Sequence, residues 1–401
     1  MFEKEARAAR ERTADIISRH GTRLTGSADC LAAADELASA AGKLADRTRT
    51  EDFAVHPGAF LGFIKVMIVL YAAACLALPF APMASAMALA AGAVILVLEF
   101  FLYKELIDPF YPRRTGRNVT AVLEPAGVAK RQVIVSGHHD SARIFNFYVE
   151  RPELYSFKLY SGMGAFILFL AAALVLTAIG PSRAILLGAS VLFAALFVFL
   201  IPLWRFASKE GTPGAGDNLA ASAAALELLG IFRARRDSGQ GLSSTRLVFV
   251  SFDAEEAGLR GARAWAKAHK ADIAALPTWN YNMDCMYKAE DLRFLTSDLN
   301  GSVALDARAA TACAEAARKR GVKAPVEPIA FLTGGTDAAE LAKKGARATT
   351  FIGMQWSNEA RGNCYHTPGD TIEAVTPEVL ELAIEVGAEF VERLDSGELD
   401  R

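Results

Sequence analysis

The stretch VIVSGHHDSARI, residues 133–144, places two histidines and an aspartate directly after a short β-branched run. Such a run favours a strand, and the polar residues after it would lie where the strand ends. Residues two apart on an extended strand end face the same way, so His138 and Asp140 share one face and His139 points to the other. Taken alone, this pattern is more often a solvated loop or a satisfied polar pair than a metal site.

Similar strand-like runs alternate with helical patterns along the chain. Runs rich in valine, isoleucine, phenylalanine and threonine predict strands at 47–55, 118–125, 131–139, 245–254, 278–287, 292–296 and 346–353. Helices are predicted within 26–45 and at 217–230, 258–269, 303–319, 336–344 and 376–394. Strands that alternate with helices favour an α/β domain built in layers.

The composition narrows the class of protein. The chain has 401 residues and a formal net charge of −2, so it lacks the basic footprint of a nucleic-acid-binding protein. Its five cysteines share no short CxxC spacing, which indicates reduced thiols rather than a disulfide framework or a thiolate zinc site. Residues 1–20 alternate charges along a helical period, and we expect no cleaved export signal there.

Hydrophobic residues make up 52% of the chain, and they are concentrated in two regions. Residues 66–98 contain no charge and are interrupted only by Pro79 and Pro82, and a second region consists of 159–180 and 184–204. A membrane-spanning helix needs about 20 apolar residues, so each region predicts a hairpin of two transmembrane helices. The alternative is four buried helices of a soluble protein, but core helices of this length normally keep a polar face.

The hairpins interrupt the α/β domain rather than precede it. We expect residues 1–58, 111–150 and 207–401 to form one discontinuous domain, with hairpins at 59–110 and 151–206. Two helices per insertion return the chain to the same side of the membrane, as a single folded domain requires.

Positive charges set the expected orientation of an integral protein of the inner or plasma membrane. They flank the open ends of the hairpins, whereas the two turns hold only Arg183. The flanking residues are Lys65, Lys104, Arg113, Arg114, Arg117, Arg143, Arg151, Lys158, Arg205 and Lys209. Loops rich in lysine and arginine stay on the cytoplasmic side, so the folded domain should be cytoplasmic.

Lys65 and Glu99 are about equally far from the turn of the first hairpin. In an antiparallel hairpin they would lie at similar depth, and a lone charge in the bilayer is costly, so an ion pair between them is one expectation. The alternative is that both side chains extend to the interface.

Polar residues follow apolar runs at four further places. They are Asp217 in GAGDN, Glu255 and Glu256 in SFDAEE, Asp284 in NMD and His366 in CYHTPGD. A pair of glutamates is usually a charged surface, but ligands of an α/β sheet gather at the carboxyl ends of its strands, where these residues lie. Two histidines with several carboxylates suit catalytic zinc, with manganese or cobalt as substitutes.

The order GHHDS, GAGDN, DAEEAGLRGA, NMDCM and YHTPGDT resembles the co-catalytic zinc exopeptidases, the family of bacterial leucyl aminopeptidases, glutamate carboxypeptidase II and glutaminyl cyclase. GTRLTGSADCLAAADELA, NVTAVLEP and the last helix are similar too. The resemblance implies a mixed β-sheet flanked by helices, here with the two hairpins inserted. The TGGTDAAEL stretch departs from the family, since many members have serine, aspartate and histidine there.

The resemblance also implies a role for each matching residue. It assigns His138 and Asp284 to one zinc and Glu256 and His366 to a second, with Asp217 as the bridge between them.

Three further residues would act beside the metal ligands. Glu255 matches the general base, and Asp140 would accept a hydrogen bond from His138. Tyr365 would donate to the oxyanion, although an aromatic residue beside a histidine is more often packing. His139 would be a bystander or a residue of the substrate pocket.

The implied function is a membrane-embedded zinc aminopeptidase that hydrolyses peptides through a metal-bridged water. One alternative is a catalytically silent relative that serves as a receptor or assembly factor, because this fold also hosts proteins without metals. Matching residues at every ligand and base position count against it. A second alternative is an enzyme that catalyses cyclisation with one zinc, as glutaminyl cyclase does.

The second hairpin lies in the chain between His138 and Asp217. At about 3.3 Å per extended residue, its shorter connector keeps the metal centre within roughly 40 Å of the membrane face. We therefore expect a membrane-proximal site that trims short or apolar peptides. The alternative is that the hairpins are anchors or the interface of a homo-oligomer, for which Ala84, Ala88, Gly92 and Gly162 would permit close helix packing.

Overall fold

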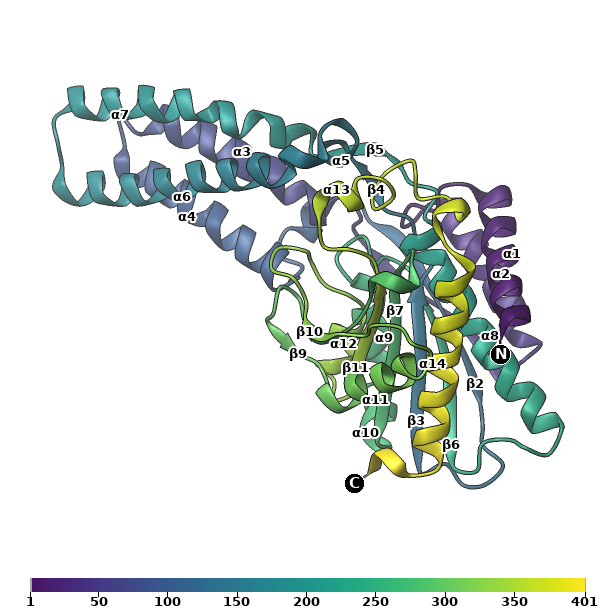
Figure 1. The fold of residues 1–401 in the computed structure, drawn as a ribbon. Helices are drawn as coiled ribbons and strands as arrows, with labels where there is room; N and C mark the ends of the chain where they lie inside the picture. Colours follow the sequence, from purple (N-terminus) through teal and green to yellow (C-terminus); the bar gives the residue numbers. More distant parts are fainter. Residues whose placement is uncertain (1, 401) are drawn as a thin grey trace.

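The centre of the molecule is a mixed β-sheet with helices on both faces, and four apolar helices project from one end of it (Figure 1). The structure is a computed structural model, and it describes residues 2–400. The strands lie in the order β1-β2-β6-β3-β7-β11-β8-β10, with β9 paired to β8. The α/β fold class predicted from the sequence is therefore confirmed.

The large sheet is parallel in its middle and has antiparallel pairs on both sides of it, β1–β2 and β2–β6 on one side and β11–β8 on the other. Its strands are β1 (Arg47–Val55), β2 (Arg114–Leu123), β3 (Arg131–His138), β6 (Thr245–Phe252), β7 (Thr278–Met286), β8 (Leu292–Asp298), β9 (Val303–Ala304), β10 (Val326–Pro328) and β11 (Arg347–Gly353). The neighbours β6, β3, β7 and β11 run parallel, so their carboxyl ends meet at one edge. Every residue of β3 and β7 is buried, as expected of strands covered on both faces.

The structure contains each strand that the sequence predicted, and it adds four short ones. Besides β9 and β10, these are β4 (Arg143–Phe145) and β5 (Ala207–Gly211), which form a separate two-stranded sheet. Such strands are too short to show a period of two in the sequence.

Helices cover the two faces of the sheet in two hydrophobic clusters. Val133 and Val135 of β3 belong to one cluster and Ile134 belongs to the other, because successive side chains of a strand alternate between its faces. The first face carries α1 (Glu3–His20), α2 (Ala28–Gly42), α8 (Ala220–Asp237), α11 (Ala307–Arg318) and α14 (Pro377–Asp395). The second carries α9 (Arg260–Ala268), α10 (Lys270–Ala275) and α12 (Ala338–Ala342).

The predicted helices are present, but most begin a few residues later than expected. The largest functional consequence is at α8, which was expected from residue 217 and begins at Ala220. Asp217 and Asn218 precede it in a non-helical conformation. The side chain of Asp217 is therefore placed by a loop rather than by the helix.

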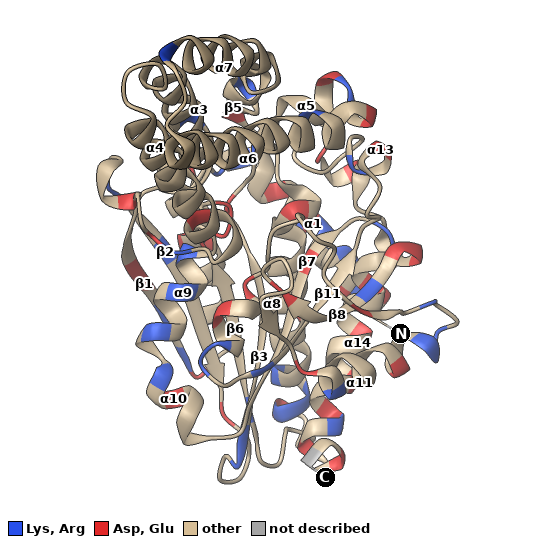
Figure 2. Ribbon diagram, turned by 90° about the vertical axis from the view of Figure 1, so that its left-hand side faces the viewer, with Lys and Arg blue, Asp and Glu red and all other residues tan. Residues whose placement is uncertain are grey.

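Four helices are long and apolar enough to cross a membrane, and Figure 2 shows almost no charge on them. Hairpin 1 consists of α3 (Ala59–Ala77) and α4 (Pro82–Leu96), which continues as a π-helical turn to Phe101. Hairpin 2 consists of α6 (Tyr155–Ile179) and α7 (Arg183–Leu196), followed by short turns to Arg205. The hairpins form their own hydrophobic cluster, apart from those of the sheet.

The two hairpins pack against each other, with their turns at the same end. Arg183 in the second turn lies 4.7 Å from the ring of Phe80 in the first. A Cβ on Gly92 of α4 would lie 2.6 Å from Phe166 of α6, so the glycine permits this close approach. Gly92 therefore contributes to packing within the chain rather than to an interface between copies.

The predicted ion pair between Lys65 and Glu99 is wrong. Glu99 is fully buried, and its Oε2 lies 3.2 Å from Nη2 of Arg260 in α9. The ammonium of Lys65 instead lies 5.5 Å from the ring of Trp204. Hairpin 1 meets the sheet domain at Glu99, and this contact supplies a partner that the hairpin by itself does not contain.

Candidate metal centre

The candidate ligands gather at the carboxyl ends of adjacent parallel strands. His138 ends β3, Asp284 lies near the end of β7, and Glu256 follows β6. Asp217 comes from the loop before α8, and His366 follows α13 (Asn358–Arg361). The structure therefore brings together all five residues that the sequence analysis assigned to metal.

Asp217 stands between the two histidines. Its Oδ1 lies 3.3 Å from Nε2 of His138, and its Oδ2 lies 3.3 Å from Nε2 of His366. Nε2 of His138 is also 3.9 Å from Oδ1 of Asp284, and Nε2 of His366 is 3.6 Å from Oε1 of Glu256. The side chains thus form two groups that share one carboxylate, which is the arrangement that a bridging ligand requires.

Unpaired atoms in the cluster indicate a place for cations. Nε2 of His138, Oδ2 of Asp217 and Oε1 of Glu256 are buried and have no hydrogen-bond partner among residues 2–400. Buried polar atoms normally have partners. The ligand atoms of these three residues lie within 4.8 Å of one another, as do those of His138, Glu255 and Asp284. Imidazole and carboxylate ligands at this spacing fit zinc.

The electrostatics of the cluster also favour cations. Burial raises the pKa of Glu255 and Glu256 well above the usual range, and it raises the pKa of Asp284 to about 7. Burial also opposes ionisation of Asp217, but the nearby imidazoles of His138 and His366 stabilise its charge and lower its pKa below the usual value. Crowded, buried carboxylates disfavour their own charge, and a bound cation would relieve this cost.

Asp140 supports both His138 and the turn that carries the two glutamates. Nδ1 of His138 lies 3.2 Å from the backbone carbonyl oxygen of Asp140 and 3.3 Å from its Oδ1. The same carboxylate accepts hydrogen bonds from the backbone N–H groups of Glu255 and Glu256, each at 3.2 Å, and from the hydroxyl of Thr25. Asp140 therefore orients one ligand and a neighbouring strand end together, and only the first contact was expected from the sequence.

His139 lies away from the cluster, and the idea that it lines the substrate pocket is wrong. Its Nδ1 lies 2.8 Å from Oγ of Ser251, and burial lowers its pKa to about 3, so the ring is neutral. Its ligand atoms lie near those of Cys30 and Asp253, where the Cys30 thiol donates to the carboxylate. Alternation along β3 turns His139 to the opposite face, as the sequence predicted.

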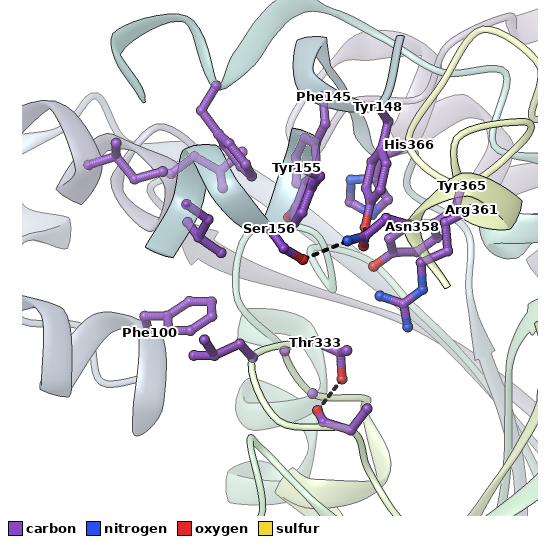
Figure 3. Close-up of a pocket in the computed structure, with 18 of the residues that line it drawn as sticks. Phe100, Phe145, Tyr148, Tyr155, Ser156, Thr333, Asn358, Arg361, Tyr365 and His366 are labelled. Carbon is purple, nitrogen blue, oxygen red and sulfur yellow. Dashed lines mark hydrogen bonds between the residues drawn. The ribbon is translucent and has the colours of Figure 1, made fainter. Parts of the chain in front are cut away.

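Aromatic rings form one wall beside His366 (Figure 3). The ring of Tyr365 lies 4.1 Å from that of His366, and the ring of Phe145 lies at the same distance. Burial raises the pKa of Tyr365 well above its usual range, so its hydroxyl keeps its proton. Arg361 lies 5.3 Å from the Tyr365 ring and adds a positive charge to this wall.

Two buried carboxylates near the cluster were missed by the sequence analysis. Oδ1 of Asp337 has no hydrogen-bond partner among the described residues, and the charges of His138 and Asp284 act on it. Asp370 accepts a hydrogen bond of 2.8 Å from the backbone N–H of Gly216 and so steadies the loop that holds Asp217. Asp337 lies in TGGTDAAEL and Asp370 lies in YHTPGDT. In the sequence, the indication of these two residues was their position in or beside the motifs that carry the candidate ligands.

The cluster opens into a cavity of about 340 Å³. Its lining includes Asp217, Glu255 and His366 on one side and residues of α3 and α6 on the other. Candidate ligands and the apolar helices of the two hairpins therefore line one space.

A mixed sheet whose strand ends collect histidines and carboxylates into a candidate cation site is the arrangement expected of a zinc exopeptidase fold. Residues 205–391 match the model of the family described as Peptidase family M28. This match confirms the resemblance that the sequence motifs indicated. No match was found among curated proteins.

Solved structures share the fold across nearly the whole chain. A zinc aminopeptidase from Bacillus subtilis has a TM-score of 0.57 at 15% identity, covering 97% of this chain and 95% of its own. A Zn-dependent exopeptidase from Parabacteroides distasonis has a TM-score of 0.55 at 13% identity, covering 97% of each chain. A glutaminyl cyclase from Fimbriiglobus ruber has a TM-score of 0.56 at 12% identity, covering 96% of this chain and 94% of its own. At these identities the likeness is one of fold.

Proposed function

We propose that this protein is a membrane-embedded zinc aminopeptidase, which removes N-terminal residues from peptides. The observation that carries the proposal is Asp217, whose two carboxylate oxygens each face a different histidine. His138 and Asp284 would complete the site of one zinc, and Glu256 and His366 would complete the other. Manganese or cobalt could replace zinc in the same ligand set.

The residues around the metal ligands supply the proton transfers. Zinc held there would lower the pKa of a water molecule and polarise the scissile carbonyl. Glu255, whose Oε2 lies 3.8 Å from Nε2 of His138, takes the proton of the attacking water and passes it to the leaving amine. Tyr365 keeps its hydroxyl proton and donates to the carbonyl oxygen as negative charge develops there. Asp140 holds the ring of His138 in the orientation that binding needs.

The distribution of charge supports a cytoplasmic peptidase domain. Lys65, Lys104, Lys158 and Arg205 lie at the ends of the helices next to this domain, whereas Arg183 lies at the distal turns. Positive residues beside membrane helices favour the cytoplasmic side. Labelling single cysteines at Ser182 and at Ser238 in intact cells checks this: a membrane-impermeant maleimide should label only Ser182→Cys.

The decisive experiment compares the wild type with Glu255→Gln, and with Glu290→Gln as a control at an exposed glutamate. Elemental analysis of the full-length protein in nanodiscs should find zinc in all three. A peptide-library digest should find release of N-terminal residues by the wild type and the control, and a loss of about 10²- to 10⁴-fold for Glu255→Gln. A metal-free wild type, or full activity of Glu255→Gln, would overturn the proposal.

The same assay separates the alternatives. A glutaminyl cyclase would release ammonia from N-terminal glutamine without releasing a residue. A silent relative would bind peptides but change none of them.

A further inference from the structure

The cavity at the candidate metal centre continues between the membrane helices. Its charged lining residues are Asp217, Glu255, Glu256, Asp284 and Arg361, and all of them belong to the peptidase domain. The lining contributed by the helices includes Phe63 and Met67 of α3, Leu96 of α4, and Met163 and Phe166 of α6. One cavity therefore has a charged end at the catalytic residues and an apolar end within the membrane bundle.

Exposed aromatic side chains mark a mouth of the cavity. Tyr160 of α6 and Phe331 of the loop before α12 both line it, yet they are 52% and 67% exposed. The ring of Phe331 lies 6.0 Å from that of Phe101 at the end of hairpin 1. Aromatic residues at the ends of membrane helices lie at the level of the lipid headgroups. If the hairpins cross a membrane, a mouth bordered by these rings lies at the level of the membrane interface.

The walls near this mouth come from different parts of the chain (Figure 3). Tyr155 and Ser156 at the start of α6 lie on one side, where Asn358 donates a hydrogen bond of 2.8 Å to Ser156. Phe100 and Thr333 lie across the space from them. Ser156, Asn358 and Thr333 thus give this part of the lining a polar character, while the part toward the bundle offers hydrocarbon.

The chemistry of the apolar end limits what can occupy it. A peptide backbone there would leave its N–H and C=O groups without partners, which is costly in an apolar surrounding. An apolar side chain has no such cost, and a cavity of about 340 Å³ lies within the size range of ligand sites. The backbone of a substrate would then stay at the charged end, where its scissile bond meets the catalytic residues.

We propose that the apolar end is a specificity pocket for peptides whose N-terminal residue is large and apolar, and that these peptides enter from the membrane interface. The inference rests on the proposed peptidase function, because the metal centre must hold the scissile bond while the side chain points between α3 and α6. Peptides of this kind partition into the interface, so a mouth at that level meets them at a raised local concentration.

The first test fills the apolar end and compares substrates. In full-length protein in nanodiscs, Met163→Trp should lower the ratio of kcat/KM for Leu-initiated over Ala-initiated peptides by at least about tenfold, because side-chain discrimination in an apolar pocket has this size. Ile167→Trp is the matched control, since Ile167 lies on the same helix but is 57% exposed toward lipid. The control should leave the ratio unchanged, and an unchanged ratio in Met163→Trp would overturn the pocket.

The second test measures binding without turnover. Glu255→Gln in nanodiscs should bind a dansylated Leu-initiated peptide more tightly than its Ala-initiated counterpart, and adding Met163→Trp should remove the difference. If the wild type hydrolyses no peptide but this difference persists, the proposed function falls and the pocket stands. If hydrolysis occurs but Met163→Trp changes neither the ratio of kcat/KM nor the difference in binding, the pocket is refuted while the proposed function stands. A further outcome is lipid that co-purifies with the wild type and is absent from Met163→Trp. If the ratio of kcat/KM is then unchanged, the cavity is a lipid site and the inference is overturned.

Discussion

The two hairpins attach to the sheet domain by different chemistry. Hairpin 1 is held by a buried charge cluster, in which Arg260 forms two hydrogen bonds with Asp108 and one with Glu99. Hairpin 2 is held by aromatic rings, among them Tyr155 stacked at 4.3 Å on Tyr148. Charge pairs demand one geometry, whereas ring contacts tolerate small displacements.

Each attachment also supports a different half of the candidate metal centre. Arg260 begins α9 directly after the turn of Glu255 and Glu256, and it donates to the carbonyl of Gly258 in that turn. On the other side, Phe145 lies against the ring of His366, and its backbone N–H donates to the His366 carbonyl at 2.9 Å. The hairpins are therefore part of the support of the candidate site.

The largest effect is expected from Arg260→Met. It leaves the carboxylates of Glu99 and Asp108 buried without their cation, and breaking a buried pair in this way costs about 3–5 kcal/mol. Thermal unfolding of the protein in nanodiscs measures the loss. The triple variant with Glu99→Gln and Asp108→Asn should recover much of it, because no uncompensated charge remains. Equal stability of Arg260→Met and wild type would show that the charge cluster does not hold hairpin 1.

Asp140→Asn tests the orientation of a candidate metal ligand without changing the contacts that hold the hairpins. Asp140→Asn weakens the contact with His138, and loss of such a partner lowers metal affinity by about 10- to 100-fold. Competition with a chelator, followed by elemental analysis, measures this affinity. Asp29→Asn, at an exposed position in α2, is the control. Unchanged zinc affinity in Asp140→Asn would refute its orienting role.

Phe145→Leu tests the aromatic attachment of hairpin 2. It removes ring contacts with His366 and Phe206 but keeps an apolar side chain, so we expect a loss of about 1 kcal/mol in unfolding free energy. Metal release from the protein should become faster, because His366 loses a neighbour. Phe157→Leu is the matched control, since Phe157 is 61% exposed at the start of α6. Identical effects of the two changes would contradict the proposed support.

The smallest effect is expected from Lys65→Gln. Its ammonium contacts only the face of Trp204 in the described structure, and an exposed contact of this kind contributes about 0.5–1 kcal/mol. Thermal unfolding should therefore change much less than in Arg260→Met. A loss comparable to that variant would revive the idea of a buried partner for Lys65.

Much of the fold and most of the candidate site could be predicted from the sequence. The hairpins and the central strands follow from local hydrophobic patterns, which belong to a short segment whatever surrounds it. The motif order identified all five proposed ligands and Glu255. The roles of these residues stay proposals, but their convergence at one edge of the sheet is what parallel neighbouring strands require.

Other features depended on contacts between distant segments. The partner of Glu99 lies 161 residues away, so no pattern within hairpin 1 could indicate it. The TGGTDAAEL stretch departs from the family pattern and so does not indicate a role for Asp337, although the fold places this residue near His138 and Asp284. In both cases the missing information was the docking of one element on another.

The amino-acid sequence by itself determined which segments are apolar enough to cross a membrane, which runs form strands and which side chains are candidate metal ligands, because each depends on the chemistry of neighbouring residues. Only the tertiary structure decided that Arg260 pairs with Glu99, and that the apolar hairpin helices and the candidate ligands enclose one cavity. A cavity exists only where surfaces from remote segments meet, and their meeting is set by packing of the whole molecule.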